Sequence, residues 1–176
     1  SPENRMTFLD VGQGDGILLR TEHNRVYLFD FGSSSRKNPG KYILKPFLKY
    51  MGIGRIDVVA VSHEDADHTN GIMELLQNMD VWNISVGEIF IPQGREEGFA
   101  ELLGMVTNMV NGEKSVEEPA EKTDAQVLGK KLDKVSKKPT EKITGVKYPS
   151  AGVSWTDDGV MFVCLNPDAD ASYSGA

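Results

Sequence analysis

The sequence has a single cysteine, Cys164, and three histidines among its 176 residues. One cysteine excludes an intrachain disulfide, and its place in the apolar run 160–165 predicts a small buried residue rather than a reactive thiol. No apolar stretch approaches the roughly 18 uninterrupted residues that a membrane span requires. No charged segment followed by an apolar one stands at the start, so the chain shows neither a signal peptide nor a transmembrane segment.

Basic residues are also few: 19 Lys and Arg stand against 26 Asp and Glu, so the formal charge of the chain is −7. This sign opposes binding to nucleic acid, which requires Lys and Arg to neutralise phosphates. The charge is uneven, since residues 114–147 hold nine Lys against six Asp and Glu. The polar Lys/Glu-rich segment 111–141 is typical of a solvated helix, expected around 125–135, with flexible flanks. A surface that grips a nucleic-acid backbone is the alternative for this segment.

Apolar runs and turn residues predict a mixed α/β chain, with strands separated by helices. Pro46 fits the first turn of a helix, and the Asp-Asp-Gly of residues 157–159 fits a hairpin turn. Strands are expected at 6–10, 17–21, 25–30, 56–62, 86–92, 143–148, 153–156 and 160–165, and helices at 42–51, 70–79 and 96–110.

The most informative segment is His-Glu-Asp-Ala-Asp-His at residues 63–68, directly after the expected strand 56–62. A rigid strand end can present His63, Asp65, Asp67 and His68 as ligands to two neighbouring divalent ions. Mixed imidazole and carboxylate ligation suits Zn²⁺ or Mn²⁺. The alternative is an exposed acidic loop, but two of the three histidines fall within these six residues. The third histidine lies in an expected hairpin turn and is predicted to be a surface residue.

Four motifs in order resemble those of one family. The segment 63–68 is similar to the HxDxDH variant of the metallo-β-lactamase superfamily that ComEC-type competence proteins carry. Residues 8–15 (Phe-Leu-Asp-Val-Gly-Gln-Gly-Asp) resemble the opening LDVGQGD of that subfamily. Residues 28–32 match its LIDxG strand end, and residues 44–53 resemble its LPYLxxxGI helix. These proteins are the DNA-uptake channels of naturally transformable bacteria.

The resemblance implies a four-layer αββα sandwich with the metal site at one sheet edge. It implies that the four residues of the motif bind two divalent metals, and that Asp67 also orients the attacking water. Asp30 would support the site through hydrogen bonds to the ligands. Gln13 and Asp15 would lie near the substrate. A tight turn is an equally good interpretation of the glycines in that loop.

The sequence departs from the family pattern after residue 68. The family supplies further ligands there, including a bridging Asp in a Gly-Asp strand end, whereas this chain has no later histidine. Asp168 and Asp170 stand in a Pro-Asp loop instead. We therefore expect residues 1–5 to be a linker or cloning scar, and residues 6–176 to form the first half to two-thirds of the domain. Such a fragment would bind its two metals weakly or not at all, be inactive alone, and expose a sheet face that a homodimer or an exchanged strand could cover.

Three functions remain open from the sequence. The first is part of a metal-dependent nuclease domain of a DNA-uptake channel that acts on single-stranded DNA. The second is a stand-alone hydrolase of a small phosphoester, lactam or thioester, although Asp65 follows the competence-protein variant and so disfavours a β-lactam. The third is a degenerate domain that only binds DNA or a partner. The resemblance also implies an extracytoplasmic domain of a bacterial membrane protein, in contact with the membrane only through the rest of that protein.

Overall fold

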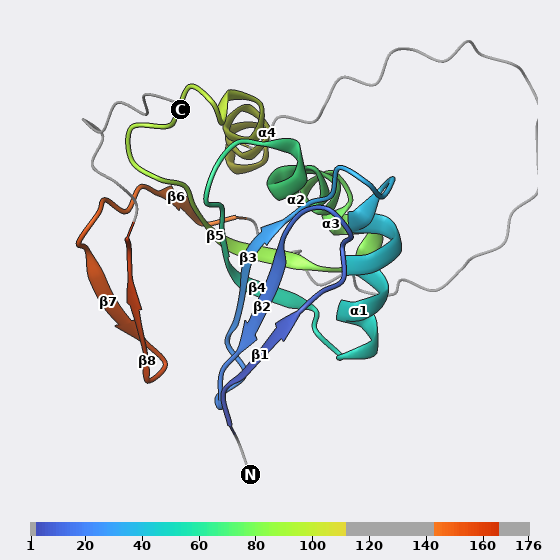
Figure 1. The fold of residues 1–176 in the computed structure, drawn as a ribbon, viewed down its shortest axis with the longest axis horizontal. Coiled ribbons are helices and arrows are strands. Elements are labelled where there is room, and N and C mark those ends of the chain that lie inside the picture. Colours follow the sequence, from blue (N-terminus) through green and yellow to red (C-terminus); the bar gives the residue numbers. More distant parts are fainter. Residues whose placement is uncertain (1–2, 112–142, 166–176) are drawn as a thin grey trace, which may run out of the picture.

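The fold is built on a six-stranded sheet with helices on one face and a separate hairpin on the other (Figure 1). The computed structural model describes residues 3–111 and 143–165. The strands follow one another across the sheet in chain order: β1 (Arg5–Phe8), β2 (Gly16–Arg20), β3 (Val26–Phe31), β4 (Arg55–Ala60), β5 (Ser85–Phe90) and β6 (Gly145–Lys147). The pairs β1–β2 and β2–β3 are antiparallel, and β3 to β6 are parallel.

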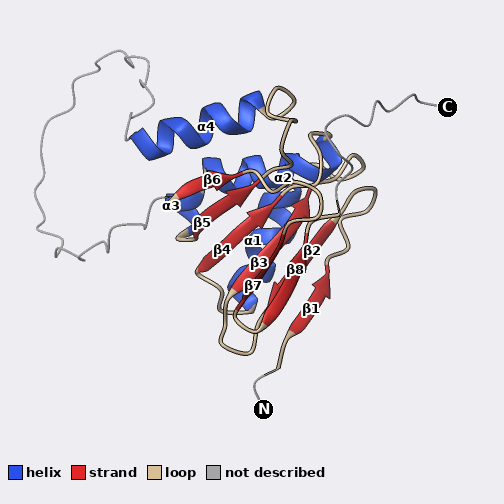
Figure 2. Cartoon of the chain, turned by 90° about the vertical axis from the view of Figure 1, so that its left-hand side faces the viewer, coloured by secondary structure: helices blue, strands red, loops and turns tan. Residues whose placement is uncertain are grey.

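Helices connect the parallel strands and all lie on the same side of the sheet (Figure 2). A π-helical turn η1 (Gly40–Leu44) runs into α1 (Lys45–Tyr50), and Pro46 occupies the first turn of α1 as expected. The other helices are α2 (Ala66–Gln77), α3 (Met79–Trp82) and α4 (Ala100–Asn111). No helix within the described ranges combines the length and the apolar character needed to cross a bilayer.

The main core lies between the sheet and these helices. One row of paired residues crosses the sheet from β2 to β6 and faces this core: Leu18, Leu28, Val59, Ile89 and Val146. Leucine and isoleucine residues of the helices pack against this row and are almost fully buried. The alternation of side chains along the strands therefore fixes which face of the sheet the helices cover.

The opposite face of the sheet is covered in part by the hairpin of β7 (Ser154–Asp157) and β8 (Val160–Val163). Trp155 and Phe162 of the hairpin pack against a smaller cluster that contains Tyr27 and Phe90 of the sheet. The ring centroids of Tyr27 and Phe162 lie 4.8 Å apart, and those of Trp155 and Phe162 lie 5.4 Å apart. Aromatic contacts therefore carry most of the packing between these two layers.

Polar contacts hold the tip of the hairpin against the β2–β3 turn. Asp157 accepts a hydrogen bond from the Tyr27 hydroxyl and forms an ion pair with Arg25, whose Nη2 lies 2.9 Å from Oδ2 of Asp157. Asp158 accepts one from the Thr21 hydroxyl and lies 2.7 Å from Nδ1 of His23. The Thr21 hydroxyl is the main reason that the pKa of Asp158 is lowered. Burial, with the Asp157 carboxylate beside it, raises the pKa of Tyr27 to about 12.

The expected mixed α/β class is confirmed, with three layers in the described residues: helices, sheet and hairpin. The fourth layer of the expected sandwich does not occur within residues 3–111 and 143–165. Met161 on the outer side of the hairpin is 71% exposed, and Phe8 on β1 is also 71% exposed. They are two of several large apolar side chains that remain exposed among the described residues.

Three expectations need correction, and a fourth lies beyond the described residues. Helix α2 begins at Ala66 rather than at 70, so the end of the ligand motif is helical. Helix α4 begins at Ala100 rather than at 96, after a series of turns. Cys164 is half-buried beside a cavity instead of lying in the core. The helix expected at 125–135 falls outside the described residues.

Candidate metal centre

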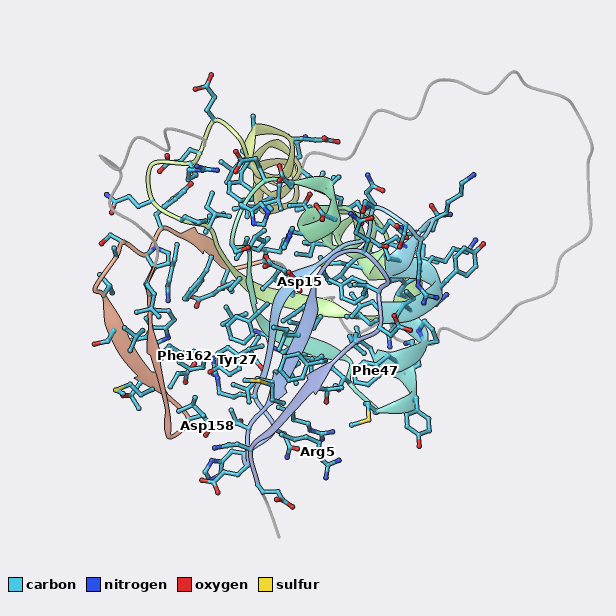
Figure 3. The ribbon with its side chains drawn as sticks, in the orientation of Figure 1. Arg5, Asp15, Tyr27, Phe47, Asp158 and Phe162 are labelled. Atoms are coloured by element: carbon cyan, nitrogen blue, oxygen red, sulfur yellow. The ribbon has the colours of Figure 1, made fainter. Side chains whose placement is uncertain are left out.

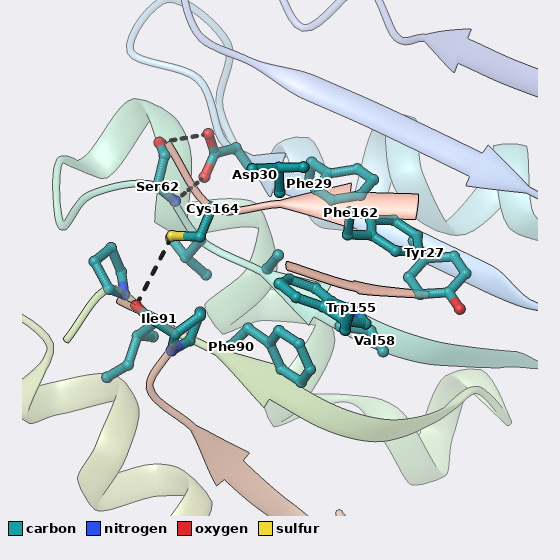
Figure 4. Close-up of a pocket in the computed structure, with 15 residues that line it drawn as sticks. Tyr27, Phe29, Asp30, Val58, Ser62, Phe90, Ile91, Trp155, Phe162 and Cys164 are labelled. Carbon is teal, nitrogen blue, oxygen red and sulfur yellow. Dashed lines mark hydrogen bonds between the residues drawn. The ribbon is translucent and has the colours of Figure 1, made fainter. Parts of the chain in front are cut away.

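The candidate site forms where β3 and β4 end at the same edge of the sheet. Asp30, near the end of β3, has a φ of 48°, in the left-handed region that few residues other than glycine adopt. Its carboxylate accepts hydrogen bonds from the backbone N–H of Ser62 at 2.7 Å and from the Ser62 hydroxyl at 2.6 Å (Figure 4). The unusual backbone at Asp30 therefore places a nearly buried carboxylate beside the residue that precedes the ligand motif.

Ser62 also orients His63. Its hydroxyl oxygen lies 2.8 Å from Nδ1 of His63. Because the hydroxyl proton of Ser62 is already donated to Asp30, the serine oxygen can only accept from the imidazole. His63 therefore carries its proton on Nδ1 and has a free electron pair on Nε2, the form in which imidazole binds metals.

Asp30 orients His68 in the same way. Nδ1 of His68 lies 3.1 Å from Oδ2 of Asp30 and 3.6 Å from Oδ2 of Asp15. A carboxylate accepts hydrogen bonds but cannot donate them, so Nδ1 of His68 carries the proton and Nε2 is free. The rings of His63 and His68 lie with their centroids 3.8 Å apart. Both imidazoles are thus held close together in the same tautomer.

The two aspartates of the motif lie at the start of α2. Asp65 is the N-cap residue but makes no side-chain capping bond, and Oδ2 of Asp65 lies 3.6 Å from Nε2 of His63. Asp67 is in the first helical turn, where its backbone carbonyl accepts from the N–H of Asp15 at 3.2 Å. Among the described residues, the Asp67 carboxylate has no hydrogen-bond or ion-pair partner. Both carboxylates remain available to a ligand.

Glycines allow three backbone segments to meet at this point. A Cβ atom on Gly32 would lie 2.5 Å from the backbone carbonyl carbon of Asp67, and one on Gly14 would lie 2.6 Å from the carbonyl oxygen of Asp67. Gly14 also has a φ of +145°. The glycines of the loop 12–14 and of the β3 end are therefore required for close backbone approach, which is the tight-turn interpretation.

Gln13 lies in this same loop but has a structural partner of its own. Its backbone N–H donates to Oγ of Ser35 at 2.8 Å, and its carbonyl accepts from the N–H of Ser34 at 2.8 Å. These contacts fix the loop 12–15 against the loop 33–36. Gln13 is exposed, and the Asp15 side chain is 60% exposed beside His68. Both positions are accessible to a substrate at the site.

Glu64 is the member of the motif that turns away from the histidines. Its two carboxylate oxygens accept from Nη2 of Arg95 at 3.0 and 2.8 Å. This hydrogen bond is the main cause of the lowered pKa of Glu64. The pair joins the ligand motif to the loop that follows β5, so Glu64 has a role in positioning that loop.

The donor atoms suit Zn²⁺ or Mn²⁺ in kind, but they form pairs rather than a complete site. His63 faces Asp65, and His68 faces Asp15 and Asp30. In residues 3–111 and 143–165 no group of three or more His, Cys, Asp or Glu side chains is placed to hold a metal ion. The described residues alone therefore do not complete a site that would hold a metal tightly.

Sequence comparison connects this geometry to a known family. A family model described as the metallo-β-lactamase superfamily matches residues 9–100, which is more than half of the chain. This chain belongs to the metallo-β-lactamase superfamily. The match includes the loop with Gln13 and Asp15, the β3 end with Asp30, and the motif 63–68.

The resemblance to competence proteins is confirmed within the superfamily. The chain is 40% identical over 72 residues to "Competence protein ComA" of Neisseria gonorrhoeae, a match that covers 40% of this chain and 10% of that protein. It is 27% identical over 110 residues to "ComE operon protein 3" of Bacillus subtilis (strain 168), covering 55% of this chain and 14% of that protein. The matched regions thus span only about a tenth to a seventh of the length of these relatives.

One solved structure shows a limited likeness to this chain. It is titled "Crystal Structure of a New Diphosphatase from the PhnP Family" and is 13% identical in sequence. The alignment covers 53% of this chain and 34% of that chain, with a TM-score of 0.36.

Sequence reasoning missed Ser62 and the cavity beside it. Ser62 was assigned to the strand 56–62, although a hydroxyl between an apolar strand and a ligand motif is a recognisable signal. The cavity has a volume of about 300 Å³ and lies between the sheet and the hairpin (Figure 4). Its walls are mainly aromatic and aliphatic, with Asp30, Ser62 and the Cys164 thiol at one end. No sequence pattern links Cys164 to that place, because the contact depends on how the hairpin folds back.

Proposed function

We propose that this chain forms the first part of a metal-dependent hydrolase domain, and that the whole protein cleaves phosphodiester bonds of single-stranded DNA as a competence protein. Membership of the metallo-β-lactamase superfamily and similarity to two competence proteins support this proposal. Within it, the domain lies outside the cytoplasm and meets the membrane only through the rest of the protein.

The observation that carries the proposal is the network in which Ser62 contacts Nδ1 of His63 and Asp30 contacts both Ser62 and Nδ1 of His68. Ser62 and Asp30 hold both imidazoles with Nδ1 protonated, which leaves two Nε2 electron pairs at one edge of the sheet. A surface loop that carried two incidental histidines would not need a nearly buried Asp–Ser–His network behind them. Such supporting networks are a regular feature of histidines that bind metals.

In this proposal His63, Asp65, Asp67 and His68 are the ligands that this chain contributes to two divalent ions, Zn²⁺ or Mn²⁺. Two such ions can stabilise the attacking and leaving oxygens of a phosphodiester. Asp67 is the proposed residue for orienting the attacking water, and its unpaired carboxylate is compatible with that task. Since the described donors form pairs, further ligands must come from outside the described residues, and the ions bind weakly to this chain alone.

A degenerate domain that only binds DNA or a partner is the second candidate. The observation in its favour is that the described residues hold no group of three potential ligands. The two candidates differ in the whole protein, where a hydrolase domain takes up metal stoichiometrically and a degenerate one does not.

The experiment that tests the proposal compares the 176-residue chain with the complete gene product. Each is incubated with 5′-labelled single-stranded DNA and Mn²⁺ or Zn²⁺, and cleavage is followed on denaturing gels. We expect cleavage by the complete protein, no cleavage by the chain alone, and loss of cleavage in complete protein with His68→Ala. Glu64→Gln is the matched control, because this carboxylate in the same motif is paired with Arg95.

Two results would contradict the proposal, the first in its claim that this chain holds only part of the site and the second in its claim of nuclease activity. Strong cleavage by the 176-residue chain that disappears with His63→Ala would show that the site is already complete. Complete protein that neither binds metal nor cleaves DNA would leave the degenerate binding domain as the function.

A further inference from the structure

Basic residues are concentrated in one part of this acidic chain. Residues 31–56 contain six Lys and Arg and no Asp or Glu. Because the whole chain has a formal charge of −7, the remaining residues carry −13. The window covers the loop after β3, η1, α1 and the start of β4. A local charge of this size in an acidic protein creates a region of positive potential on its surface.

The helical part of this window has a buried face and a basic one. Leu44 and Leu48 are fully buried, and Phe47 points from α1 toward the sheet (Figure 3). Lys41 and Lys49 are exposed, while Lys45 is half-buried with its ammonium 5.6 Å from the Trp82 ring centroid. The three lysines recur every fourth residue. They therefore form a row about 12 Å long on one side of η1 and α1.

Within residues 3–111 and 143–165, these lysines have no carboxylate partner. In the described part of the chain, no ion pair within 4.0 Å involves Lys37, Lys41, Lys45 or Lys49. Arg36 pairs with Asp10 at 3.1 Å, on the exposed surface. The nearest carboxylate on α2 is that of Glu74, which accepts from the backbone N–H of Lys41 at 2.9 Å. The lysine ammonium groups are thus free to bind an external anion.

Two tyrosines directly follow lysines in this segment, Tyr42 after Lys41 and Tyr50 after Lys49. Tyr42 is 62% exposed and Tyr50 is 88% exposed. The ammonium of Lys41 lies 5.0 Å from the ring centroid of Tyr42. Proteins that bind single-stranded nucleic acid combine exposed aromatic rings with cations: the bases stack on the rings, and the phosphates bind the lysines.

The basic surface also leads to the candidate metal centre. Arg36, which directly precedes Lys37, packs beside Gly12, where an added Cβ would lie 3.1 Å from Nε of Arg36. An open hollow has Arg36 and Lys37 in its lining, together with Glu64 and Ala66 of the ligand motif, and Glu74 and Glu101 also line it. The hollow therefore places this end of the basic segment next to the start of α2, at the edge of the motif.

We propose that Lys37, Lys41, Lys45 and Lys49, with Tyr42 and Tyr50, form a binding surface for single-stranded nucleic acid. This inference deepens the proposed function and rests on it in identifying the strand as DNA. Binding itself requires neither metal nor cleavage. An anionic membrane is the competing partner for basic residues. The exposed tyrosines and the connection to the ligand motif favour a strand over a bilayer.

The test measures binding of the 176-residue chain to a fluorescent 20-nucleotide oligothymidylate by anisotropy, in EDTA, at several salt concentrations. We expect the triple variant K41Q/K45Q/K49Q to bind on the order of tenfold more weakly and its log–log salt slope to fall by about 2, since each single-strand phosphate contact contributes about 0.7. Tyr50→Ala is expected to weaken binding roughly fivefold or more, because it removes a stacking surface.

The matched control is K130Q/K131Q/K134Q, which removes the same charge from the Lys/Glu-rich segment. This control is expected to retain the wild-type affinity, and urea unfolding curves confirm that each variant folds. Unchanged DNA binding by the first triple variant would overturn the proposal, as would a greater loss in the control. Binding to phosphatidylglycerol vesicles is measured for the same variants. If the first triple variant loses vesicle binding but keeps DNA binding, the proposal is also overturned. Because EDTA prevents hydrolysis, failure of the nuclease proposal would leave this result unaffected.

Discussion

The Asp30 carboxylate lies 3.1 Å from Nδ1 of His68, although the two residues are 38 positions apart in the chain. Each side chain is only 13% exposed. The contact joins the end of β3 to the first turn of α2, and Ser62 extends it to His63. Asp30 and Ser62 therefore fix the orientation of the two imidazoles before any ligand binds.

Replacing Asp30 by Asn tests this organisation. Asn tolerates the left-handed backbone at this position, so the fold is expected to persist. Unlike the carboxylate, the amide of Asn can either accept or donate a hydrogen bond, so it no longer selects the form of His68 with the proton on Nδ1. We expect His68 to become a mixture of tautomers. Two-dimensional ¹⁵N–¹H NMR of the imidazoles reports this, with wild-type His63 and His68 both protonated on Nδ1.

Ser62→Ala is the companion variant for this measurement. It removes the bond to His63 but leaves the Asp30–His68 contact, so only the His63 signals are expected to change. His23 lies far from the network, in the β2–β3 turn, and provides an internal reference. If both histidines prove to be protonated on Nε2 in the wild type, the proposed organisation is wrong.

The close backbone contacts of Gly32 predict a steric cost for a methyl group. Gly32→Ala should lower the free energy of unfolding by about 1–3 kcal/mol, because its Cβ would meet the backbone of Ala66 and Asp67 at 2.5–2.7 Å. Gly104→Ala is the control, since nothing lies within 4 Å of its added Cβ, and alanine should stabilise α4 by about 0.5–1 kcal/mol. Urea unfolding measures the free energy of unfolding of both variants. If Gly32→Ala and Gly104→Ala changed it equally, the proposed steric contact at Gly32 would be excluded.

Tyr27 predicts how stability depends on alkaline pH. Burial raises its pKa from 10.0 to about 12, so the folded state holds the proton more tightly than the unfolded state does. The contribution to stability is complete below pH 10 and is lost as the pH rises toward 12. We expect a loss of about 1–3 kcal/mol over this range, from 1.36 kcal/mol per pKa unit.

Tyr27→Phe is the control for the alkaline effect, because phenylalanine has no group to ionise. The variant loses the hydrogen bond to Asp157 and should be less stable at pH 8. Its stability should nevertheless fall less than that of the wild type between pH 10 and 12. Parallel pH profiles for the two proteins would show that Tyr27 does not cause the decline.

Much of the sheet could be predicted from the sequence, because its strands are short apolar runs bounded by turn residues. The start of α2 was placed too late because apolar periodicity begins only near Ile72, while the first turn is polar. The ligand motif itself was evident, since it stands at a strand end. The direction in which the Glu64 side chain points could not be predicted, because it depends on a contact with Arg95, 31 positions away in the chain.

The supporting network was harder to predict than the ligands. Ser62 looks like an ordinary strand residue until β3 and β4 are paired in register. The row of lysines on η1 and α1 is less conspicuous in the sequence than the Lys/Glu-rich segment. Its significance depends on exposure and on missing ion-pair partners, which only the folded chain shows.

The most direct test of the central claim is paramagnetic relaxation by Mn²⁺ in NMR spectra of the isotopically labelled 176-residue chain. Low concentrations of Mn²⁺ should broaden the signals of His63, Asp65, Asp67 and His68 first, together with Asp15 and Asp30, and His63→Ala should abolish this selectivity. Broadening that spares these residues, or that spreads evenly over the exposed carboxylates of the chain, would contradict the account.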